Sequence, residues 1–265
     1  MIAQNFVTRT LRPMLLSAEM ALRQQATDSF VLFAMVFQPI IIAVLALWML
    51  RDKGAQNAIF IVIGSGMTGL WSALLFMGGN SITMERWTGT LEELTGAPAS
   101  MHTIVFGKNL ASVGQSLLSM VAAYALAAIF FGYPIRVANP GLFAVSLALT
   151  VVAFIAFGMI LSPLFLLNPQ VQDFQNGMEF PVYILSGFLF PIALLPGWTT
   201  PISYILPTYW AAQAAHLSAE GGAVGGIYFA WAMLLILAAV HLAISGWLFR
   251  LVLRKARVDA TLGLE

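Results

Sequence analysis

The chain has 265 residues, of which 60% are hydrophobic and 9% are charged, and its net charge is +1. A soluble domain is about 45–50% apolar and about 25% charged, so this composition excludes an ordinary soluble protein and predicts a chain that lies mainly in lipid. The small net charge gives no bulk attraction to nucleic acid, and the absence of cysteine excludes disulfides, thiolate metal sites and cysteine nucleophiles.

Residues 1–27 have the pattern of an amphipathic helix, with apolar residues at helical spacing on one face and most charged residues on the other. We expect this helix to lie flat in the headgroup region beside the first membrane span. A second interpretation is that it also packs against a partner subunit. The apolar face comprises Val7, Leu11, Met14, Leu15, Ala18 and Leu22.

Six apolar runs predict a six-span transmembrane domain over residues 28–250. A helix needs about 20 apolar residues to cross the hydrocarbon core of a bilayer. The runs are residues 30–50, 58–77, 104–131, 142–167, 174–195 and 227–249. The fifth is interrupted by Pro181, Gly187 and Pro191. An even number of spans places both termini on the same side of the membrane.

The basic residues predict which side that is. With the N-terminus in the cytoplasm, nine lysines and arginines fall in cytoplasmic segments and three in outer loops. This bias fits the positive-inside rule. Residues 251–265 then form a cytoplasmic tail, and residues 84–98 form a cytoplasmic loop.

Residues 84–98 are a polar island between two apolar runs and hold three of the eleven acidic residues. Thr90 and Glu93 match a capping box, and Gly96 and Pro98 are typical of a helix end. The predicted helix is only one or two turns long, which is marginal in water. We therefore expect it to dock on a soluble partner.

The segment 191–220 is rich in proline yet apolar. Thr200-Pro201 and Pro207 suit helix starts, because proline is tolerated in the first turn. We expect two short re-entrant helices that dip into the outer leaflet and cap a pathway, since irregular backbone at membrane depth must be satisfied by protein or by a water-filled cavity. Glu220-Gly221-Gly222 predicts the turn into the last span.

No catalytic, metal or nucleotide site is predicted in this chain. The glycine-rich stretch from Gly64 to Gly69 lacks the Gly-Lys-Ser/Thr end of a phosphate-binding loop and is more typical of close helix packing. The three histidines are far apart in the sequence, which argues against a metal site. Glu179 and His241 are ionisable residues within spans, and they leave an ion-coupled carrier open as another class of function.

Two stretches resemble type-2 ABC transporter permeases. Residues 85–94, together with Pro98 and Ser100, are similar to the family's E-R-x-x-G-T-L-E-x-L…P-x-S segment, which contacts the ATPase. The second stretch is similar to the family's fifth span and re-entrant helices. It comprises Phe174-Gln175-Asn176, Phe180-Pro181, Leu185-Ser186-Gly187-Phe188, Pro191, Leu195-Pro196 and Ile205-Leu206-Pro207. One departure is Trp87-Thr88, where many members carry a charged residue, and it bears on partner specificity.

The resemblance implies an all-α integral membrane fold of the type-2 exporter architecture, in the plasma (inner) membrane of a prokaryote. Two permease copies, identical or sister chains, would bind two ABC ATPase subunits. Those subunits would hold ATP and magnesium, and this chain would bind no cofactor. The complex would export an apolar or amphipathic substrate, such as a drug, an antibiotic or a lipid-like molecule. Alternatives are polysaccharide or glycolipid export and, in different classes, an ion-coupled carrier or a passive scaffold.

The resemblance also assigns three sets of residues. The ATPase-coupling set is Glu85, Arg86, Thr88, Gly89, Thr90, Leu91, Glu92 and Glu93. The substrate-path set is Trp71, Phe76, Asn80, Phe174, Met178, Glu179 and Phe180. The extracellular-gate set is Ser186, Gly187, Phe188, Pro191, Pro196 and Pro207.

Overall fold

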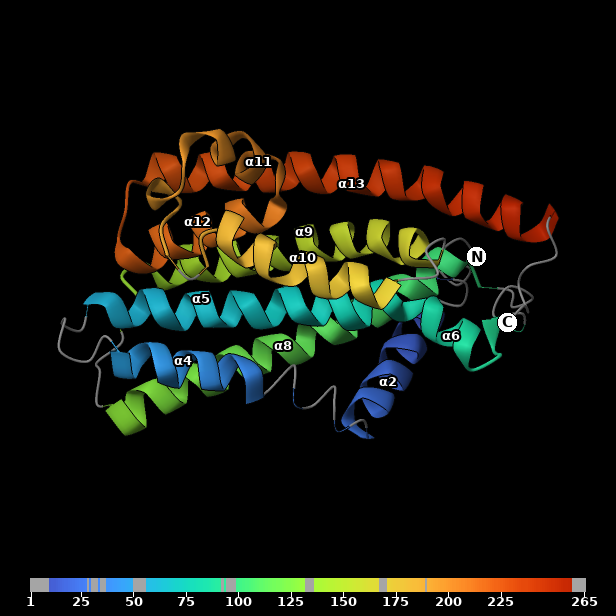
Figure 1. Ribbon diagram of the computed structural model, residues 1–265, viewed down its shortest axis with the longest axis horizontal. Coiled ribbons are helices and arrows are strands. Elements are labelled where there is room, and N and C mark those ends of the chain that lie inside the picture. The colour runs from blue at the N-terminus through green and yellow to red at the C-terminus, as the bar shows by residue number, and fades with distance from the viewer. Residues whose placement is uncertain are drawn as a thin grey trace.

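The structure is a computed structural model that describes residues 10–27, 29, 33, 37–49, 56–91, 93, 99–131, 136–166, 171–188 and 190–258. Within these residues every regular element is helical (Figure 1). The elements are α2 (Arg12–Thr27), α4 (Gln38–Met49), α5 (Gln56–Ser72), η4 (Ala73–Gly78), η5 (Gly79–Ser81), α6 (Thr83–Trp87), α8 (Met101–Phe131), α9 (Pro140–Leu166), α10 (Val171–Leu185), η6 (Ile192–Leu194), η7 (Gly197–Thr199), α11 (Thr200–Ile205), α12 (Pro207–Glu220) and α13 (Val224–Val258).

Three helical segments of the described chain are long and apolar enough to cross a membrane: Ile59–Ser81, Pro140–Leu166 and Val224–Val252. They correspond to the second, fourth and sixth predicted spans. Helix α8 has 31 residues, whereas α4 and α10 have 12 and 15. The arrangement of six spans remains a prediction.

The long helices pack into one bundle. Helix α9 packs against α13 and α8, α5 packs against α4 and α8, and α12 lies against α5, α9 and α13. The elements α2, α6 and the C-terminal end of α13 lie toward one end of the bundle, and α11 and α12 lie at the other (Figure 1). The coupling and gate segments are therefore at opposite ends of the molecule.

Helix α2 packs with its small and polar side against α8. Ser17, Ala21 and Gln25 are buried, and the amide of Gln25 donates to the hydroxyl of Ser112 at 2.9 Å. Leu15 and Leu22 from the predicted apolar face are exposed, which leaves this side free for lipid and fits a helix anchored at the membrane surface. Val7 lies outside the described residues.

Glycines of α5 allow close packing, as the sequence predicts. A side chain at Gly66 would collide with Met120 of α8, and one at Gly64 would collide with the backbone carbonyl of Phe188. The second contact brings the turn after α10 directly onto α5.

The fifth predicted span is wrong in its extent, because α10 ends at Leu185 rather than continuing to residue 195. Gly187 has a φ of 74°, a left-handed conformation that glycine adopts without a Cβ penalty. The N–H of Gly187 donates to Ile184 at 3.2 Å, and that of Phe188 to Tyr183 at 3.2 Å. These two bonds form a Schellman motif, which ends the helix.

The two proline-initiated helices form where the sequence predicts them. Helix α11 begins at Thr200 with Pro201 in its first turn, and α12 begins at Pro207. Gly221, with a φ of 79°, ends α12. The depth of these helices in the membrane is still a prediction.

Candidate coupling segment, substrate path and gate

The coupling segment follows directly from the second predicted span. The chain is helical from α5 through η4 and η5, and α6 starts at Thr83. Gly89, with a φ of 75°, ends α6 in a second Schellman motif, in which Thr90 donates to the carbonyl of Glu85 at 2.9 Å. The chain is helical again at Leu91, which is buried in the hydrophobic core.

The structure gives no hydrogen bond between Thr90 and Glu93 of the kind that a capping box would make, and Thr90 makes another contact. The hydroxyl of Thr90 donates to the carboxylate of Glu85, because the left-handed turn at Gly89 folds the chain back onto α6. Glu93 is helical and exposed. Glu92, Gly96 and Pro98 lie outside the described residues.

An ion pair fixes this segment to the bundle. The ammonium of Lys108 on α8 binds the carboxylate of Glu85 on α6, and the two side chains are 12% and 17% exposed. Lys108 also donates to the backbone carbonyl of Ser81 at 3.4 Å. The base of the coupling segment is therefore tied to α8, while Trp87, Thr88, Gly89 and Glu93 stay exposed.

Polar groups behind the coupling segment join η4 and η5 to α9 and α10. The hydroxyl of Ser162 donates to the carbonyl of Gly78 at 2.8 Å, and its oxygen lies 3.1 Å from the hydroxyl oxygen of Ser81. The buried amide of Gln175 donates to the carbonyl of Leu75 at 2.8 Å and accepts from Asn80 at 3.2 Å. Each contact gives a partner to a polar group in an apolar region.

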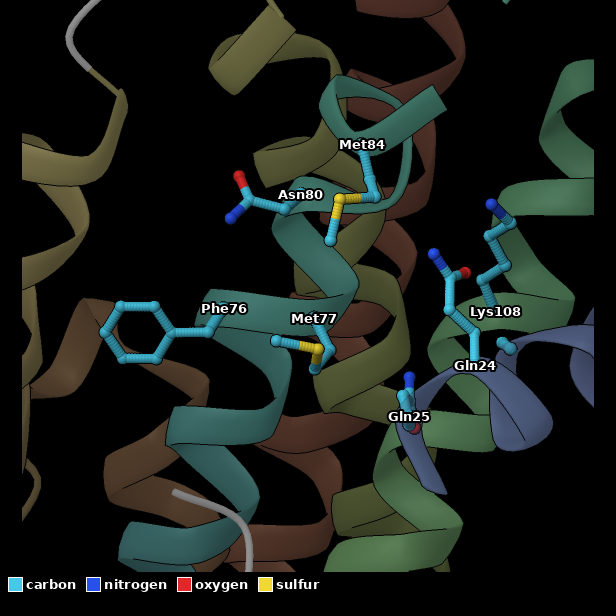
Figure 2. A pocket seen from close by; sticks show the side chains of 8 residues that line it. Gln24, Gln25, Phe76, Met77, Asn80, Met84 and Lys108 are labelled. Carbon is cyan, nitrogen blue, oxygen red and sulfur yellow. The ribbon is translucent and has the colours of Figure 1, made fainter. Parts of the chain in front are cut away.

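A small cavity of about 40 Å³ lies between α2, η4, η5, α6 and α8. It has room for about three water molecules. Figure 2 shows Gln24, Gln25 and Lys108 on one side of it and Met77, Asn80 and Met84 on the other. Ala21 and Phe76 complete its lining.

The seven predicted path residues do not form one surface. Trp71 is fully buried and stacks on Phe157, with ring centroids 5.8 Å apart, so in this conformation it is a core residue. Phe76 and Asn80 line the cavity described above. Phe174 and Phe180 are exposed on α10, Met178 is half-buried and Glu179 is buried.

Glu179 accepts hydrogen bonds from three helices. Its Oε1 accepts from Ser72 of α5 at 2.8 Å, from Tyr183 of α10 at 2.7 Å and from Gln38 of α4 at 3.5 Å. The hydroxyls of Ser72 and Tyr183 also contact each other. The carboxylate thus joins α4, α5 and α10 near the middle of the candidate span Ile59–Ser81.

The predicted gate residues lie around the turn after α10. The hydroxyls of Ser186 and Thr208 form a hydrogen bond that joins this turn to the start of α12. Phe188 is buried with its ring 6.2 Å from that of Tyr183. Pro191 and Pro196 precede the short helices η6 and η7, and Pro207 starts α12.

The histidines have separate environments. His241 packs on Phe157 with centroids 5.0 Å apart, whereas His216 stacks on Phe60 at 4.2 Å. Among the described residues no group of three histidine, aspartate or glutamate side chains is placed to hold a metal ion.

A family model described as ABC-2 type transporter matches residues 14–218, which is most of the chain. The chain belongs to the ABC-2 type transporter family. It is therefore a membrane permease of an ABC transporter, in a family that normally pairs with an ABC ATPase subunit. A comparison with curated proteins found no match.

The sequence of this ABC-2 type permease does not indicate three side chains that form polar contacts between its helices. In the sequence Lys108 stands out only as a basic residue that fits the positive-inside rule, and the pattern predicts none of these contacts for Gln175 or Ser72. The available signal was their polarity inside long apolar helices, since such groups need partners in a membrane. The partner of each is distant in sequence, so the pattern alone does not identify it.

Proposed function

We propose that this ABC-2 type permease exports an apolar or amphipathic substrate, such as a drug, an antibiotic or a lipid-like molecule. The observation that carries the proposal is the attachment of the coupling segment. Its exposed tip from Trp87 to Gly89 is available to a partner, and its base is fixed by the Glu85–Lys108 ion pair. A partner that moved this tip would move α5 and α8 with it.

The proposed assembly contains two permease copies and two ABC ATPase subunits. ATP and magnesium are bound by the ATPase, and residues 85–93 of the permease form the contact. The termini face the cytoplasm of a prokaryotic cell. The excess of basic residues in the predicted cytoplasmic segments supports this orientation.

In the proposed mechanism, ATP binding closes the ATPase subunits and displaces the coupling segments. The displacement passes along η5, η4 and α5 to α10, which is joined to them through Gln175 and Glu179. The turn at Phe188 and the Ser186–Thr208 contact then open toward the outside. Two arrangements of packed helices are biased by a nucleotide bound to another subunit.

The side chains exposed on α10 favour an apolar or amphipathic substrate. Phe174 and Phe180 are exposed and Met178 is half-buried, and rings and thioethers suit such ligands. Export of a polysaccharide or glycolipid is the alternative within the same class. An ion-coupled carrier would need a relay of ionisable groups, and Glu179 and His241 have separate neighbours.

The test is co-purification followed by transport. The chain should bring down a separate subunit that carries a nucleotide-binding motif, and the double variant Glu92→Gln with Glu93→Gln should weaken this assembly and reduce transport. Glu19→Gln is the matched control, because this carboxylate is exposed on α2 and pairs only with Arg23 among the described residues. Wild-type assembly and transport in the double variant would exclude the coupling role.

A further inference from the structure

The carboxylate of Glu179 is buried without a cation beside it in the described part of the chain. Glu179 is 8% exposed, and the three groups that donate to it are neutral. Two ion pairs of the described residues join other groups, Arg23 with Glu19 and Lys108 with Glu85.

A carboxylate in this setting gains free energy from a positive partner. Transfer of an unpaired charge from water into an apolar region is costly, and a cation that pairs with the carboxylate offsets that cost. All three donors converge on Oε1. Among the described residues no group donates a hydrogen bond to Oε2.

Aromatic rings stand next to this carboxylate. Phe180 is adjacent in sequence and 60% exposed, and its ring packs edge-on against that of Tyr183 with centroids 5.7 Å apart. Tyr183 itself donates to Glu179. Ring faces attract cations, most strongly where water is excluded. A positively charged apolar molecule could therefore pair with the carboxylate and also contact the aromatic rings.

We propose that Glu179 selects a cationic amphipathic substrate and pairs with its positive group. The proposal rests on the proposed function and narrows it to one class of cargo. Ser72, Tyr183 and Gln38 hold the carboxylate in place from three helices. The exposed rings of α10 cover the apolar part of the substrate. A neutral or anionic molecule of the same shape lacks the pairing and binds more weakly.

The experiment uses the permease assembled with its ATPase in lipid nanodiscs. The probes are tetraphenylphosphonium and tetraphenylborate, which have the same shape and opposite charge. Binding and stimulation of ATP hydrolysis are measured for the wild type, for Glu179→Gln and for Asp173→Asn. Asp173 is the matched control, because it is an exposed carboxylate on the same helix and outside the Glu179 cluster.

We expect the wild type and Asp173→Asn to bind the cation at least tenfold more tightly than the anion, as a charge-assisted contact of this kind implies. Glu179→Gln should lose that preference, and Glu179→Asp should retain part of it. An unchanged preference in Glu179→Gln, or no preference in the wild type, overturns the inference. If the wild type assembles with its ATPase and lacks the preference, the exporter proposal stands and the cargo class is wrong. If it does not assemble, the proposed function itself fails.

Discussion

Glu85 on α6 and Lys108 on α8 form a largely buried ion pair at the base of the coupling segment. Lys108 also contacts the carbonyl of Ser81, so one ammonium on α8 joins the end of the candidate span Ile59–Ser81 and the coupling segment. The exposed tip is therefore linked to α5 through the backbone and to α8 through this side chain.

Breaking this ion pair should destabilise the protein. Lys108→Met leaves the Glu85 carboxylate largely buried without its cation, which costs about 1–3 kcal/mol. Thermal unfolding of the purified permease measures the loss. The double variant Glu85→Gln with Lys108→Met should recover part of it, because no charge is then left unpaired.

The control is the pair of Arg23 with Glu19, whose side chains are 79% and 55% exposed. Its removal by Arg23→Gln should change stability by no more than about 0.5 kcal/mol. Equal effects for the two pairs would contradict the special role given to Lys108.

Gln175 should be required for the contact between α10 and η4. Gln175→Leu removes the donor to the carbonyl of Leu75 and leaves a buried acceptor unsatisfied, at a cost of about 1–3 kcal/mol. The exposed neighbour Asn176 provides the control as Asn176→Leu, which should be nearly neutral. The melting temperatures of the two variants measure this difference in stability. Similar values would show that the Gln175 contact contributes little.

Gly64 should tolerate no side chain. Gly64→Ala places its Cβ against the backbone carbonyl of Phe188, so the gate turn must move away from α5, at about 1–3 kcal/mol. Gly114→Ala in α8 meets no other atom within 4 Å and should be neutral or slightly stabilising. The melting temperatures of the Gly64→Ala and Gly114→Ala variants, each compared with the wild type, test this prediction. Limited proteolysis of the gate turn then reports whether Gly64→Ala displaces it.

His102 should make the protein less stable in acid. Burial, and then the nearby charge of Arg250, lower the pKa of His102 from its ordinary value of 6.5. The unfolded chain therefore takes up this proton before the folded chain does, and stability falls as the pH drops below about 6.5. His102→Gln should flatten the dependence of the melting temperature on pH between 7.5 and 5.5, and an unaltered dependence would argue against this contribution.

The helix boundaries set by proline and glycine were partly readable from the sequence. The starts of α11 and α12 and the turn at Gly221 were predicted because Pro201, Pro207 and Gly221 favour those conformations locally. The sequence also indicates an interruption of the fifth run at Gly187, and the same rule applied there ends α10 at the correct place. The predicted span nevertheless extends to residue 195, because the apolar run continues beyond Gly187 and hydropathy alone does not mark where a helix stops.

The polar contacts of the candidate site were not readable, because they depend on packing between distant segments. Glu85 meets Lys108 only when α6 folds back onto α8, and Gln175 meets Leu75 only when α10 lies along η4. The contact of Thr90 is of the same kind. The turn at Gly89 brings the carboxylate of Glu85 to the hydroxyl of Thr90, a contact that the local sequence pattern does not indicate.

The π-helical turn Ala73–Gly78 carries one more residue than an α-helical turn would need. Deleting a single residue there would restore ordinary α-helical winding, and the later side chains of the rod would keep their direction, because the wide turn takes up one extra residue within the same rotation. A deletion in the α-helical part of α5 has no such turn to absorb it, so Asn80 would rotate by about 100° away from Gln175 and Glu85 would rotate away from Lys108. Engineering of this rod should therefore confine changes of length to Ala73–Gly78 and preserve the residue count of α5.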